Sequence, residues 1–284
     1  MSPSASLAPK WWSDFRYLTA RKPILSAVMK STGGPFSNAA RNLRQIGSSP
    51  ASWAVVGLIL AIHAVVSAAG GPERRWVWHF YQTLGLTRDG VLTGKVWKIF
   101  TYGLLHGSWW HVVLNALFVL LIGSRIEHMA GRSAMLKVTC AGVIGGGIGH
   151  LLLAAGGANA PLLVGLSGGC LALLLLLTTL SPQSRMMPLP VTGKSLGLGI
   201  LTAELLLALM NPALGLPGFS TIGNALVGYG MGSWFEMGHA CHFGGGIMGW
   251  LYGRWLLRPR ISLKRLRADR MRREASESQR VRSD

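Results

Sequence analysis

Charged residues are scarce in this chain of 284 residues. They make up 13% of the sequence, whereas an average soluble domain carries about a quarter, and half of the residues are hydrophobic. Acids are the rarest, because ten Asp and Glu stand against 28 Lys and Arg, which gives a net charge of +18. A soluble globular domain is therefore disfavoured, and a membrane protein is favoured.

The positive charge is concentrated at the two ends of the chain. Residues 1–50 carry seven Lys or Arg and one acid, and residues 254–284 carry eleven Lys or Arg and four acids. Nucleic-acid-binding proteins are also basic, but basic segments that flank an apolar body are typical of membrane proteins with cytoplasmic tails. We therefore expect a lipid bilayer, and no nucleic acid, among the partners. The expected organisation is a basic cytoplasmic extension over 1–50, a membrane core over 51–257 and a basic cytoplasmic tail over 258–284.

Several sequence signals are missing. The three cysteines, Cys140, Cys170 and Cys241, lie in apolar or Gly-rich stretches without zinc-like spacing, so neither a disulfide framework nor a metal site is expected. No His-Glu-x-x-His motif and no pair of intramembrane aspartates occurs, which excludes two other intramembrane protease chemistries. Residues 1–30 lack the apolar core of a signal peptide. The basic start of the chain weakly resembles a mitochondrial transit peptide, and its aromatic run over 11–22 suits a membrane surface equally well.

Six segments are apolar and long enough to cross a bilayer, which takes about 20 residues of helix. They cover residues 52–69, 108–124, 134–155, 164–181, 196–212 and 232–257. This pattern predicts an all-α membrane protein built as a bundle of six transmembrane helices. The long loop 70–107 is rich in tryptophan and arginine, and we expect it to be a partly embedded interfacial segment.

The positions of Lys and Arg predict the orientation of the spans. Basic residues occur in the turns after the second and the fourth span, and they are absent from the loops 156–163 and 213–231. By the positive-inside rule, both termini are cytoplasmic, and the second, fourth and sixth spans begin at the outer face. Polar residues near these three starts should therefore lie at one depth.

A serine between glycines lies at the start of the fourth span, in Gly165-Leu166-Ser167-Gly168. The N-terminus of a helix offers free N–H groups to a developing oxyanion, although a serine at a contact between small residues looks the same. With Gly169 the segment also matches the Gly-x-Ser-x-Gly elbow of α/β-hydrolases. That elbow needs a preceding strand, and here a leucine-rich span follows, so we exclude that class.

The sixth span contains His242 followed by Gly245 and Gly249. A histidine inside a membrane span is costly and is usually functional, although it can also be a structural hydrogen-bonding group between helices. The two glycines form a small-xxx-small face, which lets another helix approach closely. Packing of this face on the glycines of the fourth span would bring His242 within reach of Ser167.

The start of the second span carries His111 and Asn115, which are four residues apart and so share one helix face. Both side chains can donate hydrogen bonds to an oxyanion. The alternative is that they are polar residues that cap the span at the interface.

Acids in the apolar segments allow two other interpretations. Glu236, His239 and His242 could suggest metal ligation, but they spread over about 120° of helix face, which is awkward for one ion. Glu204 is a single acid in the fifth span. A transporter or channel would show paired intramembrane charges or broken helices instead.

Taken together, the motifs resemble the rhomboid family of intramembrane serine proteases. They are, in order over residues 52–257, Trp97-Lys98, His106, His111, Asn115, Gly123-x3-Glu127-x3-Gly131, Gly165-Leu166-Ser167-Gly168 and His242-x2-Gly245-x3-Gly249. The resemblance implies a dyad without a carboxylate partner, in which Ser167 is the nucleophile and His242 the general base. It implies an oxyanion hole made by His111, Asn115 and the Ser167 backbone N–H, transmembrane proteins as substrates, and no cofactor.

Two positions depart from the family pattern. Lys98 stands where arginine is usual, and it keeps the charge but loses the guanidinium fork. Leu171 stands where an aromatic residue often stacks on the catalytic histidine, which bears on the orientation of His242. The resemblance also implies structural roles for His106 and Glu127.

The resemblance leaves other functions open. The fifth span would border the route of the substrate from the lipid, so Glu204 is a candidate gate, or else an acid whose hydrogen bonds are satisfied inside the protein. An inactive rhomboid-like protein that binds clients is the alternative function. Such proteins typically lose the serine or the histidine, and both are present here. A core without a seventh span favours a bacterial inner membrane over a eukaryotic organelle.

Overall fold

The computed structural model describes residues 35–154, 162–186, 190–258 and 266–275. Most of the predicted N-terminal extension, parts of the basic tail and most of the loop 156–163 lie outside the described residues. No strand forms within the described ranges, where two isolated β-bridges occur. The all-α fold class is confirmed.

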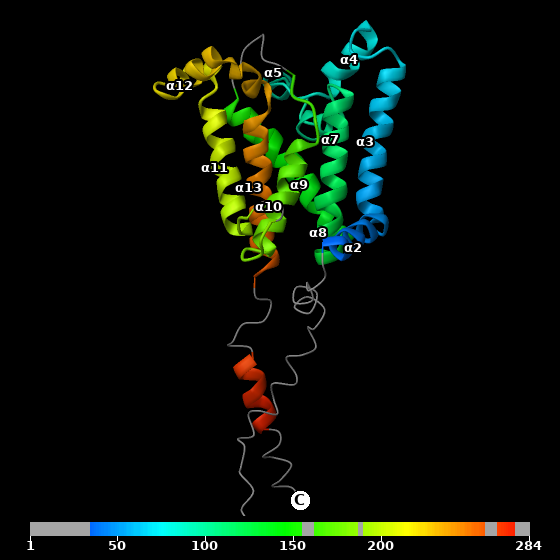
Figure 1. Ribbon diagram of the computed structural model, residues 1–284, viewed down its shortest axis with the longest axis vertical. Helices are drawn as coiled ribbons and strands as arrows, with labels where there is room; N and C mark the ends of the chain where they lie inside the picture. Colours follow the sequence, from blue (N-terminus) through cyan, green and yellow to red (C-terminus); the bar gives the residue numbers. More distant parts are fainter. Residues whose placement is uncertain (1–34, 155–161, 187–189, 259–265, 276–284) are drawn as a thin grey trace, which may run out of the picture.

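Six helical rods stand side by side and form the bundle (Figure 1). They are α3 (Pro50–Ala68), the continuous rod of α7 (Trp109–Phe118), η4 (Val119–Gly123) and α8 (Ser124–Ala130), α9 (Arg132–Leu153), α10 (Ser167–Leu180), α11 (Gly193–Leu209) and α13 (His239–Leu256). Three of the rods, α3, the rod from Trp109 to Ala130 and α9, are long and apolar enough to cross a membrane by length and composition.

Short helices close the two ends of the bundle. They are α2 (Pro35–Gly47), α4 (Arg75–Leu84), α5 (Arg88–Leu92), α6 (Lys98–Thr101), η3 (Tyr102–Leu104), η5 (Pro212–Leu214), α12 (Phe219–Leu226), η6 (Val227–Met231) and η7 (Gly232–Glu236). Figure 1 shows α4 and α12 at one end of the bundle and α2 and α8 at the other.

Two helices begin later than the hydropathy pattern predicts. The fourth span was expected from residue 164, but α10 begins at Ser167, because the preceding backbone is bonded elsewhere. Leu163 exchanges two backbone hydrogen bonds with Leu86, at 3.0 and 3.1 Å, and the Gly165 N–H donates to the Tyr102 carbonyl at 3.0 Å. The sixth span was expected from residue 232, but η7 precedes it and α13 begins only at His239.

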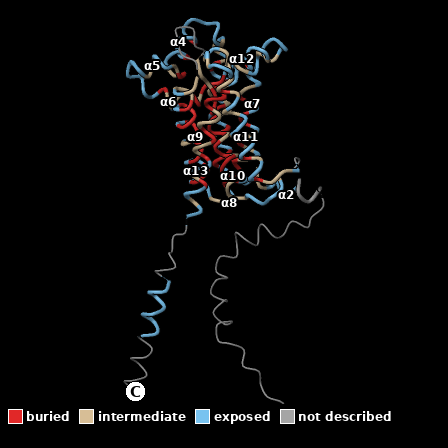
Figure 2. The backbone as a smooth tube through the Cα atoms, turned by 90° about the vertical axis from the view of Figure 1, so that its left-hand side faces the viewer, coloured by how far each residue is buried: buried red, intermediate tan, exposed pale blue. Residues whose placement is uncertain are grey.

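α10 is the centre of the bundle. Figure 2 shows the buried residues concentrated in α9, α10 and α13. The α10 leucines are buried on several faces, and Leu173, Leu175 and Leu176 have almost no exposed area. A helix that is apolar all round belongs inside a bundle, so the helix that carries Ser167 lies in the interior of the bundle.

Glycines allow α13 to touch α10 backbone to backbone. A Cβ atom added to Gly245 would collide with the carbonyl oxygen of Gly168, and one added to Gly249 would collide with the carbonyl oxygen of Ala172. The packing that the small-xxx-small face predicts is therefore present. The other side of α13 meets α9 in the same way, where Gly149 faces the Ala240 carbonyl.

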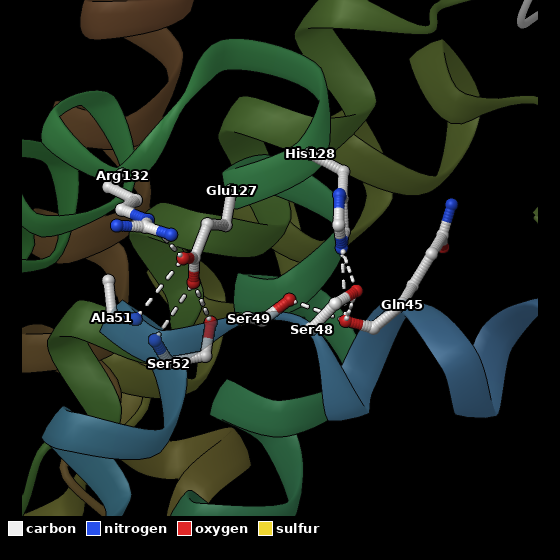
Figure 3. A network of polar contacts seen from close by, with 8 residues as sticks. All are labelled: Gln45, Ser48, Ser49, Ala51, Ser52, Glu127, His128 and Arg132. Atoms are coloured by element: carbon white, nitrogen blue, oxygen red, sulfur yellow. Dashed lines mark hydrogen bonds and ion pairs between the residues drawn. The ribbon is translucent and has the colours of Figure 1, made fainter.

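A buried carboxylate joins α8 to the start of α3 (Figure 3). Glu127 accepts hydrogen bonds from the backbone N–H groups of Ala51 and Ser52, at 3.1 and 2.9 Å, and from the Ser52 hydroxyl at 3.0 Å. The Arg132 guanidinium lies 3.5 Å away and is largely exposed. An anion at a helix N-terminus satisfies N–H groups that lack a partner and is attracted to the positive end of the helix dipole. These bonds give Glu127 the structural role that the resemblance implies.

The first loop is anchored by a buried lysine. Lys98 is 3% exposed, and its ammonium group donates to the Gln82 carbonyl at 2.6 Å and to the Thr87 hydroxyl at 3.4 Å. Burial lowers the pKa of Lys98. Its acceptors are two single oxygen atoms rather than one carboxylate, so an ammonium serves here without a guanidinium fork. Nearby exposed aromatic side chains suit an interfacial segment: Trp76, Trp78, Phe80, Trp97, Trp109 and Trp110.

Removal of the Glu127 carboxylate should destabilise the fold. We expect Glu127→Ala to lower the free energy of unfolding by about 3 kcal/mol, because buried N–H groups lose a charged acceptor. Arg132→Ala is the matched control and should cost less than about 1 kcal/mol, since its guanidinium is largely exposed and lies 3.5 Å from the carboxylate. Denaturant unfolding in detergent measures both, and equal losses would contradict the assigned role.

The glycine contacts predict opposite effects at two sites. Gly249→Ala should destabilise the protein by at least about 2 kcal/mol, because its methyl group meets the α10 backbone. Gly199→Ala in α11 should be neutral or stabilise by about 0.5–1 kcal/mol, because nothing lies within 4 Å of that position. Thermal unfolding of the two variants checks this contrast, and similar melting temperatures would show that the close approach is not required.

Candidate active site

A pocket of about 350 Å³ lies beside the start of α10, between α7, η4 and α13. It is lined by Leu114, Asn115, Leu117, Phe118, Leu121, Ser167, Cys170, Leu171 and His242. The structure thus brings three of the four candidate residues, which come from the second, fourth and sixth predicted spans, into one otherwise apolar pocket. This convergence is what a common depth at the starts of these spans predicts.

Ser167 is the first residue of α10. The N–H groups in the first turn of a helix have no partner within that helix, and the positive end of the helix dipole lies there. The preceding peptide is held from the first loop, since the Leu166 N–H donates to His106 Nε2 at 3.4 Å. The Ser167 hydroxyl therefore lies beside the free backbone N–H groups of the first turn of α10.

Gly165 makes room for His111. Gly165 has a φ of +123°, a conformation that side-chain-bearing residues rarely adopt. A Cβ atom added there would lie 2.6 Å from His111 Cε1 and Nε2 and 3.8 Å from Asn115 Nδ2. His111 does not line the pocket itself, but both oxyanion candidates, His111 and Asn115, lie close to Gly165.

Asn115 offers a free donor. Its side chain is buried, and its Oδ1 accepts a hydrogen bond from the Cys170 thiol at 3.5 Å. Its Nδ2 is also buried and has no hydrogen-bond partner within the described parts of the chain. A buried donor without a partner costs about 1–3 kcal/mol. Such a donor beside a serine is the element that an oxyanion hole needs.

His106 connects the first loop to the serine segment. The Tyr81 hydroxyl donates to its carbonyl at 2.6 Å, and its ring accepts from the Leu166 N–H. Burial, followed by the nearby rings of His111 and His63, lowers the pKa of His106 to about 3. The ring is therefore neutral and able to accept at neutral pH, which supports the structural role that the resemblance implies.

His242 has a carboxylate neighbour. It lies in the first turn of α13, and its ring Nδ1 is 3.2 Å from Glu204 Oε2. Glu204 lies in the last two turns of α11, at the same end of the bundle as the start of α13. The family resemblance placed no carboxylate beside the histidine of the dyad, whereas the structure places Glu204 there.

A second histidine shares that carboxylate. His239 Nδ1 lies 2.7 Å from the same Glu204 oxygen, and His239 Nε2 lies 2.8 Å from the Trp234 carbonyl. Glu236, which the sequence pattern placed with the two histidines, is exposed instead. The ligand atoms of Glu204, His239 and His242 lie within 4.8 Å of one another, a spacing that could hold a metal ion.

The structure places Glu204 against His242, and no aromatic side chain occupies position 171. Leu171 lines the pocket beside His242, so a stacking ring is replaced by an aliphatic side chain. With Nδ1 turned to Glu204, Nε2 is the ring nitrogen left for the serine. Across the described residues no hydrogen bond joins the Ser167 hydroxyl to the His242 ring. Such bonds are often long until substrate binds.

Sequence reasoning did not assign Glu204 to the site. The available signal was an acid in an otherwise apolar span. Its level along the span could have been compared with that of His242, because the fifth span runs toward the end where the sixth begins.

Comparisons with known proteins point to one family. A family model described as the Rhomboid domain matches residues 93–259. The chain is 29% identical over 100 residues to the chloroplastic Rhomboid-like protein 16 of Arabidopsis thaliana. It is 30% identical over 97 residues to the putative rhomboid protease YdcA of Bacillus subtilis (strain 168). Each alignment covers 34% of this chain, and the chain spans 30% and 49% of the two relatives, respectively.

The matched family segment covers more than half of the chain and includes every residue that lines the pocket. The bundle is a multi-helix membrane fold, with three helices long and apolar enough to cross a bilayer. The chain therefore belongs to the rhomboid family.

Proposed function

We propose that this protein is an intramembrane serine endopeptidase that cleaves single-span transmembrane proteins within or near the membrane. The observation that carries the proposal is the pocket that joins Ser167, His242 and the free Asn115 donor. One relative is named a putative rhomboid protease, which supports the same activity.

The residues have complementary roles in acyl transfer. The Ser167 hydroxyl attacks the peptide carbonyl while His242 Nε2 accepts its proton, and a tetrahedral intermediate forms. The oxyanion is stabilised by Asn115 Nδ2, by His111 and by the Ser167 backbone N–H. His242 then gives the proton to the leaving amine, and water hydrolyses the acyl-enzyme in a second round of the same chemistry.

The shape of the site suits an apolar segment as substrate. The rim carries Leu114, Leu117 and Leu121, which are about half exposed. In a bilayer these side chains would face lipid, so an apolar substrate can reach the pocket without crossing a charged surface. The lining is mostly apolar, and a low local dielectric strengthens the electrostatic interactions inside the pocket.

The site would lie toward the outer face of the membrane. We infer that residues 51–257 form a six-span protease domain between two basic cytoplasmic segments, 1–50 and 258–284. The absence of Lys and Arg from the loop 213–231, set against the basic ends, supports this orientation. A bacterial inner membrane is the setting that we propose.

Cleavage by purified protein tests the activity directly. Wild-type protein in detergent is incubated with a generic single-span substrate, and we expect cleavage that Ser167→Ala and His242→Ala each abolish. The double variant should be no worse than either single variant, because the two groups act as one unit. Gel analysis of the products and unfolding curves of each variant complete the measurement.

Two results would sink this assignment. Normal turnover in either single variant would show that the chemistry lies elsewhere. If folded wild-type protein binds the substrate in the assay detergent but does not cleave it, the protein is an inactive client-binding member of the family.

The oxyanion role of Asn115 predicts a loss in rate rather than in stability. Removal of one donor typically costs about 100–1,000-fold in turnover. We expect Asn115→Ala to show such a loss in kcat with little change in KM, and an unchanged or higher melting temperature, because a buried donor without a partner is removed. Asn224→Ala, at an exposed site on α12, is the matched control. An unstable Asn115→Ala protein with full activity per folded molecule would instead identify a structural residue.

A further inference from the structure

We propose that Glu204 is a positioning residue of the active site, which extends the Ser167–His242 pair to a Ser167–His242–Glu204 triad. The inference rests on the proposed protease function and goes beyond the dyad that the family resemblance implies. Its basis is the approach of Glu204 Oε2 to His242 Nδ1, at 3.2 Å, from a different helix.

The neighbouring bonds determine which nitrogen of His242 carries the hydrogen. His239 Nε2 faces the Trp234 carbonyl, which can only accept, so this nitrogen is protonated. His239 Nδ1 is 2.7 Å from Glu204 Oε2, and one proton must lie between these atoms, on either side. The same oxygen is then left with a lone pair toward His242, so His242 Nδ1 is the donor.

This tautomer is the one that catalysis needs. A hydrogen on His242 Nδ1 leaves Nε2 with a free lone pair, which can accept the proton of the Ser167 hydroxyl. When that transfer occurs the ring becomes an imidazolium in an apolar pocket, and a carboxylate at Nδ1 stabilises its charge. Glu204 would therefore act through His242, without contact with the substrate.

His239 regulates how much of the carboxylate charge reaches His242. His239 Nδ1 approaches the same Glu204 oxygen as His242 Nδ1, so the two rings compete for the carboxylate. The other titratable groups around His242 are His111 on α7, Cys241 on α13 and Cys170 on α10. The two thiols are buried, and a proton on His111 would oppose a charge on His242. Glu204 is thus the one acid near the ring among the described residues.

The test compares Glu204→Gln with Glu236→Gln, which removes the same charge from an exposed site three residues before His239. Cleavage rates are measured in the presence of a chelator from pH 5 to 9, on a transmembrane substrate and on a small soluble one. Labelling of Ser167 by a serine-reactive phosphonate is followed in parallel. We expect Glu204→Gln to lower kcat at neutral pH roughly 100-fold on both substrates, and to slow labelling similarly, while Glu236→Gln matches wild type.

The direction of the pH shift separates positioning from mere packing. Loss of the carboxylate destabilises protonated His242, so the acid limb of the kcat/KM profile should move to lower pH in Glu204→Gln. His239→Gln frees the carboxylate for His242, so the acid limb should move to higher pH. This second variant keeps the test decisive if Glu204→Gln folds poorly. A purely structural Glu204 would lower the yield of folded protein and leave both acid limbs in place.

The outcomes distinguish this inference from the function on which it rests. Wild-type protein that neither cleaves nor labels at Ser167 would overturn the proposed function. An active wild type with unchanged acid limbs in Glu204→Gln and His239→Gln overturns the triad alone. The triad is also overturned if Glu204→Gln slows cleavage of the transmembrane substrate alone, which would indicate a gate. Activity that depends on added Zn²⁺ would overturn it as well and would indicate a metal site.

Discussion

The candidate active site depends on how closely the backbones of α10 and α13 approach. Ser167 and His242 lie 75 positions apart and on different helices, and no loop holds them together. They meet because Gly245 and Gly249 bring α13 against the α10 backbone at Gly168 and Ala172. Within a bilayer, apolar side chains gain little by leaving lipid for protein, so close packing of small residues drives such contacts. The proximity of Ser167 and His242 therefore depends on two glycines, whose lack of a side chain lets the helices approach.

Hydropathy and small-residue spacing predicted the main features of the fold. Each predicted span contains a helix. A bilayer span requires about 20 apolar residues, and a run of that length can be recognised in the sequence alone. The meeting of Ser167, His242 and Asn115 was also accessible, since residues near the starts of alternate spans share one depth. The precise start of α10 could not be predicted, because Leu163 and Gly165 bond to the first loop, which lies far away in sequence.

The carboxylate at His242 shows where sequence reasoning stops. Glu204 could be recognised as an acid in an apolar span, but its neighbours depend on the rotation of α11 about its axis. Leucines surround Glu204 in the sequence, and α11 shows little amphipathic pattern that would indicate which face turns inward. The family resemblance implied that no carboxylate was needed, so the relevant contact was not sought. Only the spatial arrangement joins Glu204 to His239 and His242.

The low pKa of His106 makes the stability of the folded protein depend on pH. In an unfolded chain the imidazole takes up a proton near its ordinary pKa of 6.5, whereas in the folded protein the pKa is lowered to about 3. Above pH 6.5 the contribution of this neutral ring to stability is complete, and it declines as the pH falls toward 3, because only the unfolded chain gains the proton. The bond from the Leu166 N–H nevertheless persists through that range. In an acidic medium the protein would thus become easier to unfold, while the molecules that stay folded keep the bond that holds the residue before Ser167.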